Sequence, residues 1–98
     1  MPFDLTISPR FPPREPRKAV RLRTILLLPD DREIGVLLTN ISRSGFTALS
    51  NLAIDPQTSL GVAIPGYGIH RAEVRWSEEG EVGAKFEEEL TDTQVSAL

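Results

Sequence analysis

Cysteine is absent from this chain of 98 residues, and histidine occurs only once, as His70. Without cysteine the chain can form neither a disulfide framework nor a thiolate metal site, and this composition is typical of a reducing compartment. A single histidine gives a metal site little support as well. We therefore expect a cytoplasmic protein that holds no metal and needs no cofactor.

Long apolar runs are also lacking. No segment approaches the roughly 20 apolar residues needed to cross a bilayer, and the N-terminus lacks the basic start and apolar core of a signal peptide. We expect neither export nor membrane insertion. The sequence Asn40-Ile41-Ser42, which matches an N-glycosylation acceptor, is therefore not expected to serve as one.

The net charge of −3 is unevenly distributed along the chain. Residues 1–23 contain six basic and two acidic side chains, whereas the remaining chain contains five basic and twelve acidic ones. The front of the chain therefore attracts anions and the rest repels them. A nucleic-acid polymer would require a broad basic face, so we expect a small anionic ligand and no nucleic-acid polymer as partner.

The chain length suits a single domain. Five prolines within residues 1–16 predict a flexible N-terminal leader, and residues 17–98 then form the domain. Alternating and apolar runs between turn residues predict strands over residues 20–28, 33–39, 46–49, 60–64, 69–76 and 81–86. Six short strands predict an all-β, closed or nearly closed antiparallel barrel, and residues 87–98 predict a short helix capped by Thr91 or Asp92.

A polar corner, Asn40-Ile41-Ser42-Arg43-Ser44-Gly45, lies between the second and third predicted strands. Short Asn and Ser side chains bond to nearby backbone, and the glycine predicts a positive φ that closes the turn. On composition alone the corner is a plain β-turn. A basic segment upstream, in which Arg17 and Arg21 stand four residues apart, favours a further role.

Together the two segments resemble the signature of the PilZ domain family, RxxxR followed by (D/N)xSxxG. The later part of the chain is similar as well, because Val74-Arg75-Trp76 and Gly83-Ala84-Lys85-Phe86 look like the family's V-x-W…G-x-x-F ending. The resemblance spans roughly residues 14–88. It implies a six-stranded PilZ-type β-barrel that binds the bacterial second messenger cyclic di-GMP.

The resemblance also assigns ligand-binding residues. Arg17 and Arg21 match the arginines of RxxxR, and Asn40, Ser42 and Gly45 match a small surface that accepts one guanine. Arginine suits this ligand because its planar fork bonds phosphate oxygens or guanine O6 and N7. Asn40 stands where aspartate is commoner and offers a neutral acceptor oxygen in place of a carboxylate, which predicts some loss of affinity.

Two further arginines are secondary candidates. Arg14 stands four residues after Arg10, and this alternative register is separated from the barrel by prolines. Arg43 lies inside the corner, where it adds positive charge beside the ligand or is merely exposed. For the arginines ahead of the first strand, the alternative is a solvated basic leader.

The remaining candidates have structural interpretations. Trp76 is expected to be a strand-end core residue rather than a stacking platform, because a single tryptophan has a large apolar area to bury. Ser42, Ser44 and His70 lack the strand-turn-helix arrangement of a hydrolase nucleophile. No residue is therefore assigned a catalytic role, and we do not expect an enzyme.

Two functions remain open at this point. The first is a cyclic di-GMP sensor whose N-terminal arginine segment changes conformation on binding and presents an altered surface to an effector protein. The second is an adaptor of the same fold that binds no nucleotide and acts by protein–protein contact, with the acidic region Glu78–Glu89 as its surface. Neither the effector nor the oligomeric state follows from the sequence.

Overall fold

The structure, a computed structural model, describes residues 17–98. These residues form β1 (Lys18–Leu27), β2 (Glu33–Ile41), β3 (Gly45–Leu49), β4 (Ser59–Ile64), β5 (Gly68–Glu78), β6 (Glu81–Phe86) and α1 (Asp92–Ser96). Each predicted strand is present: residues 81–86 match β6 at both ends, and no end of the other strands differs from the prediction by more than two residues. The predicted leader, residues 1–16 with Arg14, lies outside the described residues.

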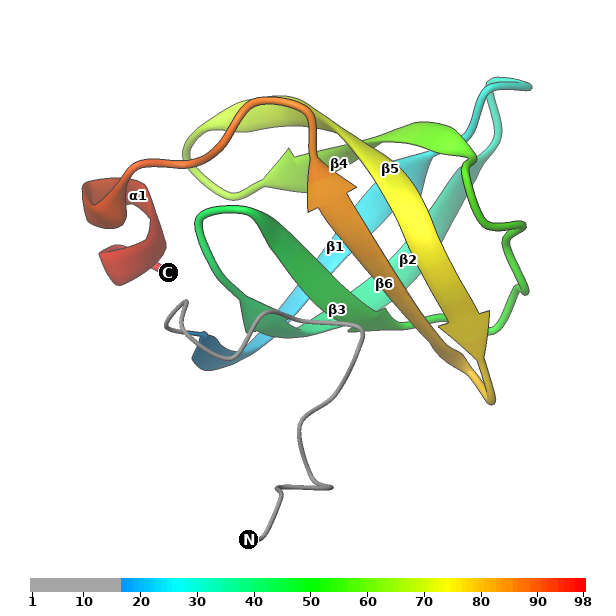
Figure 1. Ribbon diagram of the computed structural model, residues 1–98, viewed down its shortest axis with the longest axis horizontal. Coiled ribbons are helices and arrows are strands. Elements are labelled where there is room, and N and C mark those ends of the chain that lie inside the picture. The colour runs from blue at the N-terminus through cyan, green and yellow to red at the C-terminus, as the bar shows by residue number, and fades with distance from the viewer. Residues whose placement is uncertain (1–16) are drawn as a thin grey trace, which may run out of the picture.

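The six strands close into one antiparallel barrel in the order β1-β2-β3-β6-β5-β4, with β4 pairing back onto β1 (Figure 1). Closure gives each of these strands a neighbour on both sides, which removes the exposed edges that otherwise pair with other chains. The predicted fold class, an all-β six-stranded antiparallel barrel, is confirmed. The β1–β2 turn and the β2–β3 turn lie at opposite ends of the barrel.

A single core fills the barrel, and all six strands contribute to it. Side chains alternate between inside and outside along each strand because the strand is pleated. The most deeply buried apolar side chains are Leu26, Leu38, Ile41, Phe46, Ala48, Leu60, Val62, Ala72, Val74 and Val82. The rings of Phe46 and Phe86 pack together in this core, with their centroids 5.6 Å apart.

The C-terminal segment covers one end of the barrel, where α1 lies beside the β2–β3 turn (Figure 1). Thr91 is the N-cap, as predicted: its hydroxyl accepts from the Gln94 backbone N–H, and the Gln94 side chain accepts from the Thr91 N–H. Val95 and Leu98 pack against the core, which attaches this short helix to the barrel. No helix within residues 17–98 is long and apolar enough to cross a membrane.

Substitutions of two leucines on neighbouring strands test which side chains of β2 and β3 point into the barrel. Leu38 on β2 is fully buried, whereas Leu49 on β3 is 44% exposed. We expect Leu38→Ala to lower the free energy of unfolding by about 2–5 kcal/mol, because it leaves a cavity in the core. The same substitution at Leu49 should cost about 0.5 kcal/mol. Urea denaturation measures both values, and equal losses would contradict the orientation of β2 and β3.

Candidate functional site

Strand register places one residue from each of five strands side by side on the outside of the barrel. Ala19 on β1 pairs with Asn40 on β2, Asn40 with Thr47 on β3, Thr47 with Gly83 on β6, and Gly83 with Trp76 on β5. We call these five residues the outer row. Four of these residues have small side chains, so the row forms a strip of surface without bulky side chains, which ends at the large aromatic side chain of Trp76.

Asn40 faces outward because of a β-bulge at Thr39. Its neighbours Leu38 and Ile41 are both fully buried, although strict alternation would place residues three apart on opposite faces. The pairing of β2 with β3 skips Thr39, and the extra residue restores the alternation in the opposite phase. Without this bulge the Asn40 side chain would point into the core.

A second bulge, at Arg75, places Trp76 on the outer face. Val74 pairs with Ala84 inside the barrel, and the pairing then skips Arg75, so that Trp76 lies opposite Gly83. A Cβ at Gly83 would collide with the Trp76 indole, which therefore lies directly over this glycine. The prediction that Trp76 is a core residue is wrong, because the bulge reverses the alternation on which that prediction rested.

The arginine pair lies at the β1 end of the outer row. Arg21 is exposed on β1, between Val20 and Leu22, which both pack against the core. Arg21 therefore shares the outer face with Ala19, the row residue that pairs with Asn40. Arg17 is exposed just before β1. In extended backbone a spacing of four residues places two side chains on one face, roughly 13 Å apart along the strand.

The corner that was predicted as one turn contains the end of β2, the three connecting residues 42–44 and the start of β3. Ser42 is buried, and its hydroxyl oxygen accepts from the backbone N–H of Ser44 at 3.3 Å and of Gly45 at 3.2 Å. The Ser42 backbone N–H donates to the Gly45 carbonyl oxygen at 2.9 Å. The Ser42 side chain therefore holds the turn closed, and its hydroxyl is already engaged.

Glycine is required at position 45 for a structural reason other than the predicted one. Gly45 is not among the residues that have a positive φ, so the predicted left-handed turn conformation is wrong. Gly45 pairs with Lys85 on β6, and a Cβ at Gly45 would collide with the Ala84 carbonyl oxygen. Glycine is needed here because the backbones of β3 and β6 approach too closely for a side chain.

Arg43, at the tip of the turn, is directed toward the C-terminal segment. Its guanidinium Nε lies 3.5 Å from Oδ1 of Asp92 in α1, and its carbonyl oxygen accepts from the Leu90 N–H at 2.8 Å. Both the Arg43 and Asp92 side chains are exposed, so this ion pair stabilises the structure only weakly. Among the predicted residues, the structure groups Arg21 with Asn40 on the outer face, while Arg43 lies toward α1.

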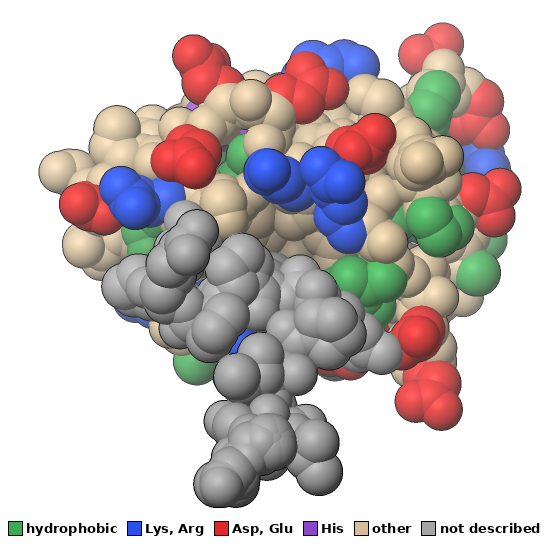
Figure 2. All heavy atoms as spheres, viewed as in Figure 1, with side chains coloured by type: hydrophobic (Ala, Val, Ile, Leu, Met, Phe, Trp, Pro, Cys, Tyr) green, Lys and Arg blue, Asp and Glu red, His purple; other side chains and the backbone are tan. Residues whose placement is uncertain are grey.

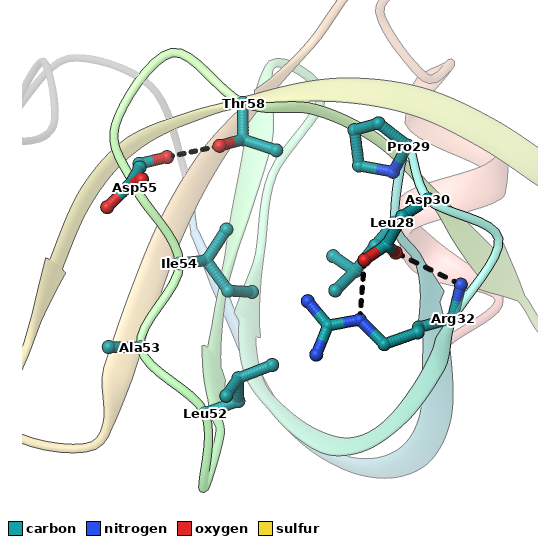
Figure 3. A pocket seen from close by; sticks show the side chains of 9 residues that line it. All are labelled: Leu28, Pro29, Asp30, Arg32, Leu52, Ala53, Ile54, Asp55 and Thr58. Carbon is teal, nitrogen blue, oxygen red and sulfur yellow. Dashed lines mark hydrogen bonds and ion pairs between the residues drawn. The ribbon is translucent and has the colours of Figure 1, made fainter.

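A separate pocket of about 270 Å³ lies between the β1–β2 turn and residues 52–58 (Figure 3). Arg32 folds back onto Asp30, with 2.7 Å between Nε and Oδ2, and its backbone N–H also donates to this carboxylate. These hydrogen bonds lower the pKa of Asp30, which keeps the carboxylate charged. None of the predicted ligand residues lines this pocket, and its only basic side chain already has an acidic partner.

Comparison with known proteins identifies no relative: no protein-family model and no curated protein matches the sequence. Within residues 17–98, no three His, Asp or Glu side chains gather as metal ligands would. The outer row is thus defined by geometry alone. Ala19, Thr47 and Gly83 were missed as site residues because they come from three strands, and nothing in the local sequence of each marks it as a neighbour of Asn40.

A matched pair of glycines tests the close approach of β3 and β6. We expect Gly45→Ala to destabilise the protein by about 1–3 kcal/mol, because the added methyl group meets the backbone of Ala84. Gly35→Ala on β2 meets no atom within 4 Å and should be neutral or stabilising by up to about 1 kcal/mol. Thermal and urea unfolding report both effects. A tolerated Gly45→Ala would show that the two strands can separate.

Proposed function

We propose that the outer row, together with Arg17 and Arg21, binds cyclic di-GMP and that the chain is a PilZ-type sensor module. The observation that carries the proposal is that Arg21 and Asn40, which are distant in the sequence, share one outer face through the Ala19–Asn40 pair. The proposed ligand is a doubly charged anion with two guanine bases. Its recognition needs positive charge, a hydrogen-bonding edge and a flat surface for a base.

The residues of this face match those needs. The Arg21 guanidinium can donate two parallel hydrogen bonds to a phosphate or to guanine O6 and N7. The Asn40 amide oxygen can accept from the guanine N1–H or N2–H₂ group. Its side chain makes no hydrogen bond to another residue within 17–98, so it is available. The small row residues Ala19 and Thr47 let a base approach the backbone.

Ligand binding also explains how such a module could signal. Drawing Arg17 toward the outer row would alter the surface that this end of the barrel presents, whereas the closed barrel itself acts as a fixed platform. An effector protein that distinguishes the two surfaces would read the ligand state. The proposal places this module in the cytoplasm.

The binding test uses isothermal titration of the purified 98-residue chain with cyclic di-GMP. We expect saturable binding and an affinity about 10- to 100-fold weaker for Arg21→Ala, because a charged hydrogen bond contributes about 1.5–3 kcal/mol. The matched control is Arg23→Ala, an exposed arginine two residues along the same face of β1 that pairs with Leu37 and lies away from Asn40. This variant should bind almost as tightly as the original chain.

Both variants should keep the thermal midpoint of the ligand-free protein, because exposed charges add little to stability. If Arg21→Ala unfolds the protein, the residue is structural and the proposed site is wrong. If the original chain gives no heat up to high micromolar ligand, the adaptor function, with the acidic region Glu78–Glu89 as its surface, replaces the sensor function.

Trp76 provides a second, optical test because it is the only tryptophan. A guanine that stacks at this end of the outer row should change the indole fluorescence, with the same midpoint as the heat signal. Trp76→Phe should retain most of the affinity, since a phenyl ring still offers an aromatic face, and should lose the optical signal. Saturating heat without any fluorescence change would place the ligand away from Trp76.

A further inference from the structure

The outer side of β1 changes in character along the strand. Leu26 is fully buried in the core, and Leu22 packs against it. Because side chains alternate along a strand, Arg23, Ile25 and Leu27 face outward. Ile25 and Leu27 are half-buried, yet neither belongs to the side chains that pack against the core. The outer side of this part of β1 therefore carries one basic side chain followed by two apolar ones.

An isoleucine of β5 extends this apolar region across β4. Ile69 is 52% exposed and pairs with Ala63 on β4. A Cβ at Gly61, also on β4, would lie 2.8 Å from Cγ2 of Ile69 and 3.7 Å from Cβ of Leu27. Both side chains therefore lie over this buried glycine, although β4 separates their strands. We call Ile25, Leu27, Ala63 and Ile69 the apolar surface.

Acidic side chains follow the apolar surface at the β1–β2 turn. Glu33 on β2 pairs with Leu27 and is exposed, and Asp31 is exposed in the turn. The other two charges of this turn, Asp30 and Arg32, bond to each other at 2.7 Å. Neither Asp31 nor Glu33 forms an ion pair with another residue of 17–98. The turn therefore offers two negative charges beside the apolar surface.

The opposite side of the barrel is arranged differently. β6 lies three strands from β1 in the closed order, and Figure 1 shows β5 and β6 on the near side with β1 behind them. On the near side, Figure 2 shows basic side chains next to acidic ones. There Arg75 lies 3.4 Å from Glu73, so opposite charges pair within one copy of the chain. On the β1 side Arg23 and Glu33 lie apart, and no ion pair within residues 17–98 joins either to another residue.

We propose that the apolar surface binds a second copy of this chain, with the two β1 strands facing each other in antiparallel directions. The two-fold axis passes near Ile25, which lies midway between Arg23 and Leu27 in the sequence. The Arg23 of each copy then faces the Leu27–Glu33 pair of the other, while Ile25 and Ile69 face their own counterparts. The contact is isologous, because both copies use the same residues.

The placement of the charges favours a second copy as the occupant. A surface rimmed by charge of one sign would repel its own copy, whereas Arg23 and Glu33 at opposite ends of the apolar surface attract each other across an antiparallel contact. The inference does not depend on the proposed ligand. Ala19, the outer-row residue of β1, lies six residues or roughly 20 Å from Ile25 along the strand, so the contact and the outer row are separate.

Sedimentation equilibrium of the full chain, between about 10 µM and 1 mM, tests the contact. The small apolar surface predicts a weak dimer with a dissociation constant of about 100 µM. We expect Ile69→Ser to weaken association about 10-fold, because apolar area is lost from the contact. The matched control is Leu49→Ser, since Leu49 is 44% exposed on β3 and lies outside the apolar surface. This variant should associate like the original chain.

Charge reversal tests how the two copies are oriented. Arg23→Glu and Glu33→Arg should each weaken self-association about 10-fold or more, because each variant places like charges in contact. A mixture of the two variants should associate as the original chain does. In the mixed pair the two reversed charges face each other, and so do the unchanged Arg23 and Glu33. Thermal midpoints of the single variants should stay within a few degrees of the original, because these side chains are exposed.

Three results would overturn the inference. If the original chain stays a monomer at about 1 mM, the apolar surface does not bind a second copy, and a different protein is its occupant. If a dimer forms but survives Ile69→Ser and both charge reversals, another surface makes the contact. If the mixture of the charge variants associates no better than each alone, the antiparallel arrangement is wrong. None of these results bears on the proposed function, which the titration with cyclic di-GMP tests separately.

Discussion

Each strand of the closed barrel has one face toward the shared core and one toward solvent, so a bulge decides on which side every later residue of its strand lies. Both ends of β2 must contribute to the core, as the burial of Val36 and Ile41 shows; on β5, Val74 is buried before the bulge, and the half-buried Ser77 lies opposite the buried Val82 after it. The bulges at Thr39 and Arg75 satisfy this requirement. As a consequence, Asn40 and Trp76 lie outside, at two places along the outer row.

The residues of the polar corner divide between holding the fold and offering contacts to a ligand. Ser42 is buried in the turn and satisfies two backbone donors, and Gly45 allows β3 and β6 to approach. Both roles would be needed in a barrel that binds nothing. Asn40 and Arg21, by contrast, have no comparable structural role and are accessible on the outer face. Under the proposed function, ligand specificity would therefore depend on these two residues more than on the complete motif.

Local charge matters more than net charge in this protein. The chain is acidic overall, with a net charge of −3, yet Arg21 is exposed on the outer face beside Ala19, the residue that pairs with Asn40. At physiological salt, charges farther away than about 8 Å are largely screened, so a bound anion responds mainly to side chains at the site. Under the proposed function, the acidic residues of the β5–β6 turn would bound the site without preventing an anion from binding.

Sequence patterns alone were sufficient to predict the six strands, the all-β antiparallel barrel and the Thr91 cap, because alternation, turn residues and capping chemistry are local properties. They also marked Arg21 and Asn40 as candidates. They failed for Trp76 and for the φ of Gly45, because a bulge and a close approach of two backbones depend on pairing with other strands. The outer row likewise follows only from register, since strand pairing, and not distance along the chain, decides which side chains become neighbours.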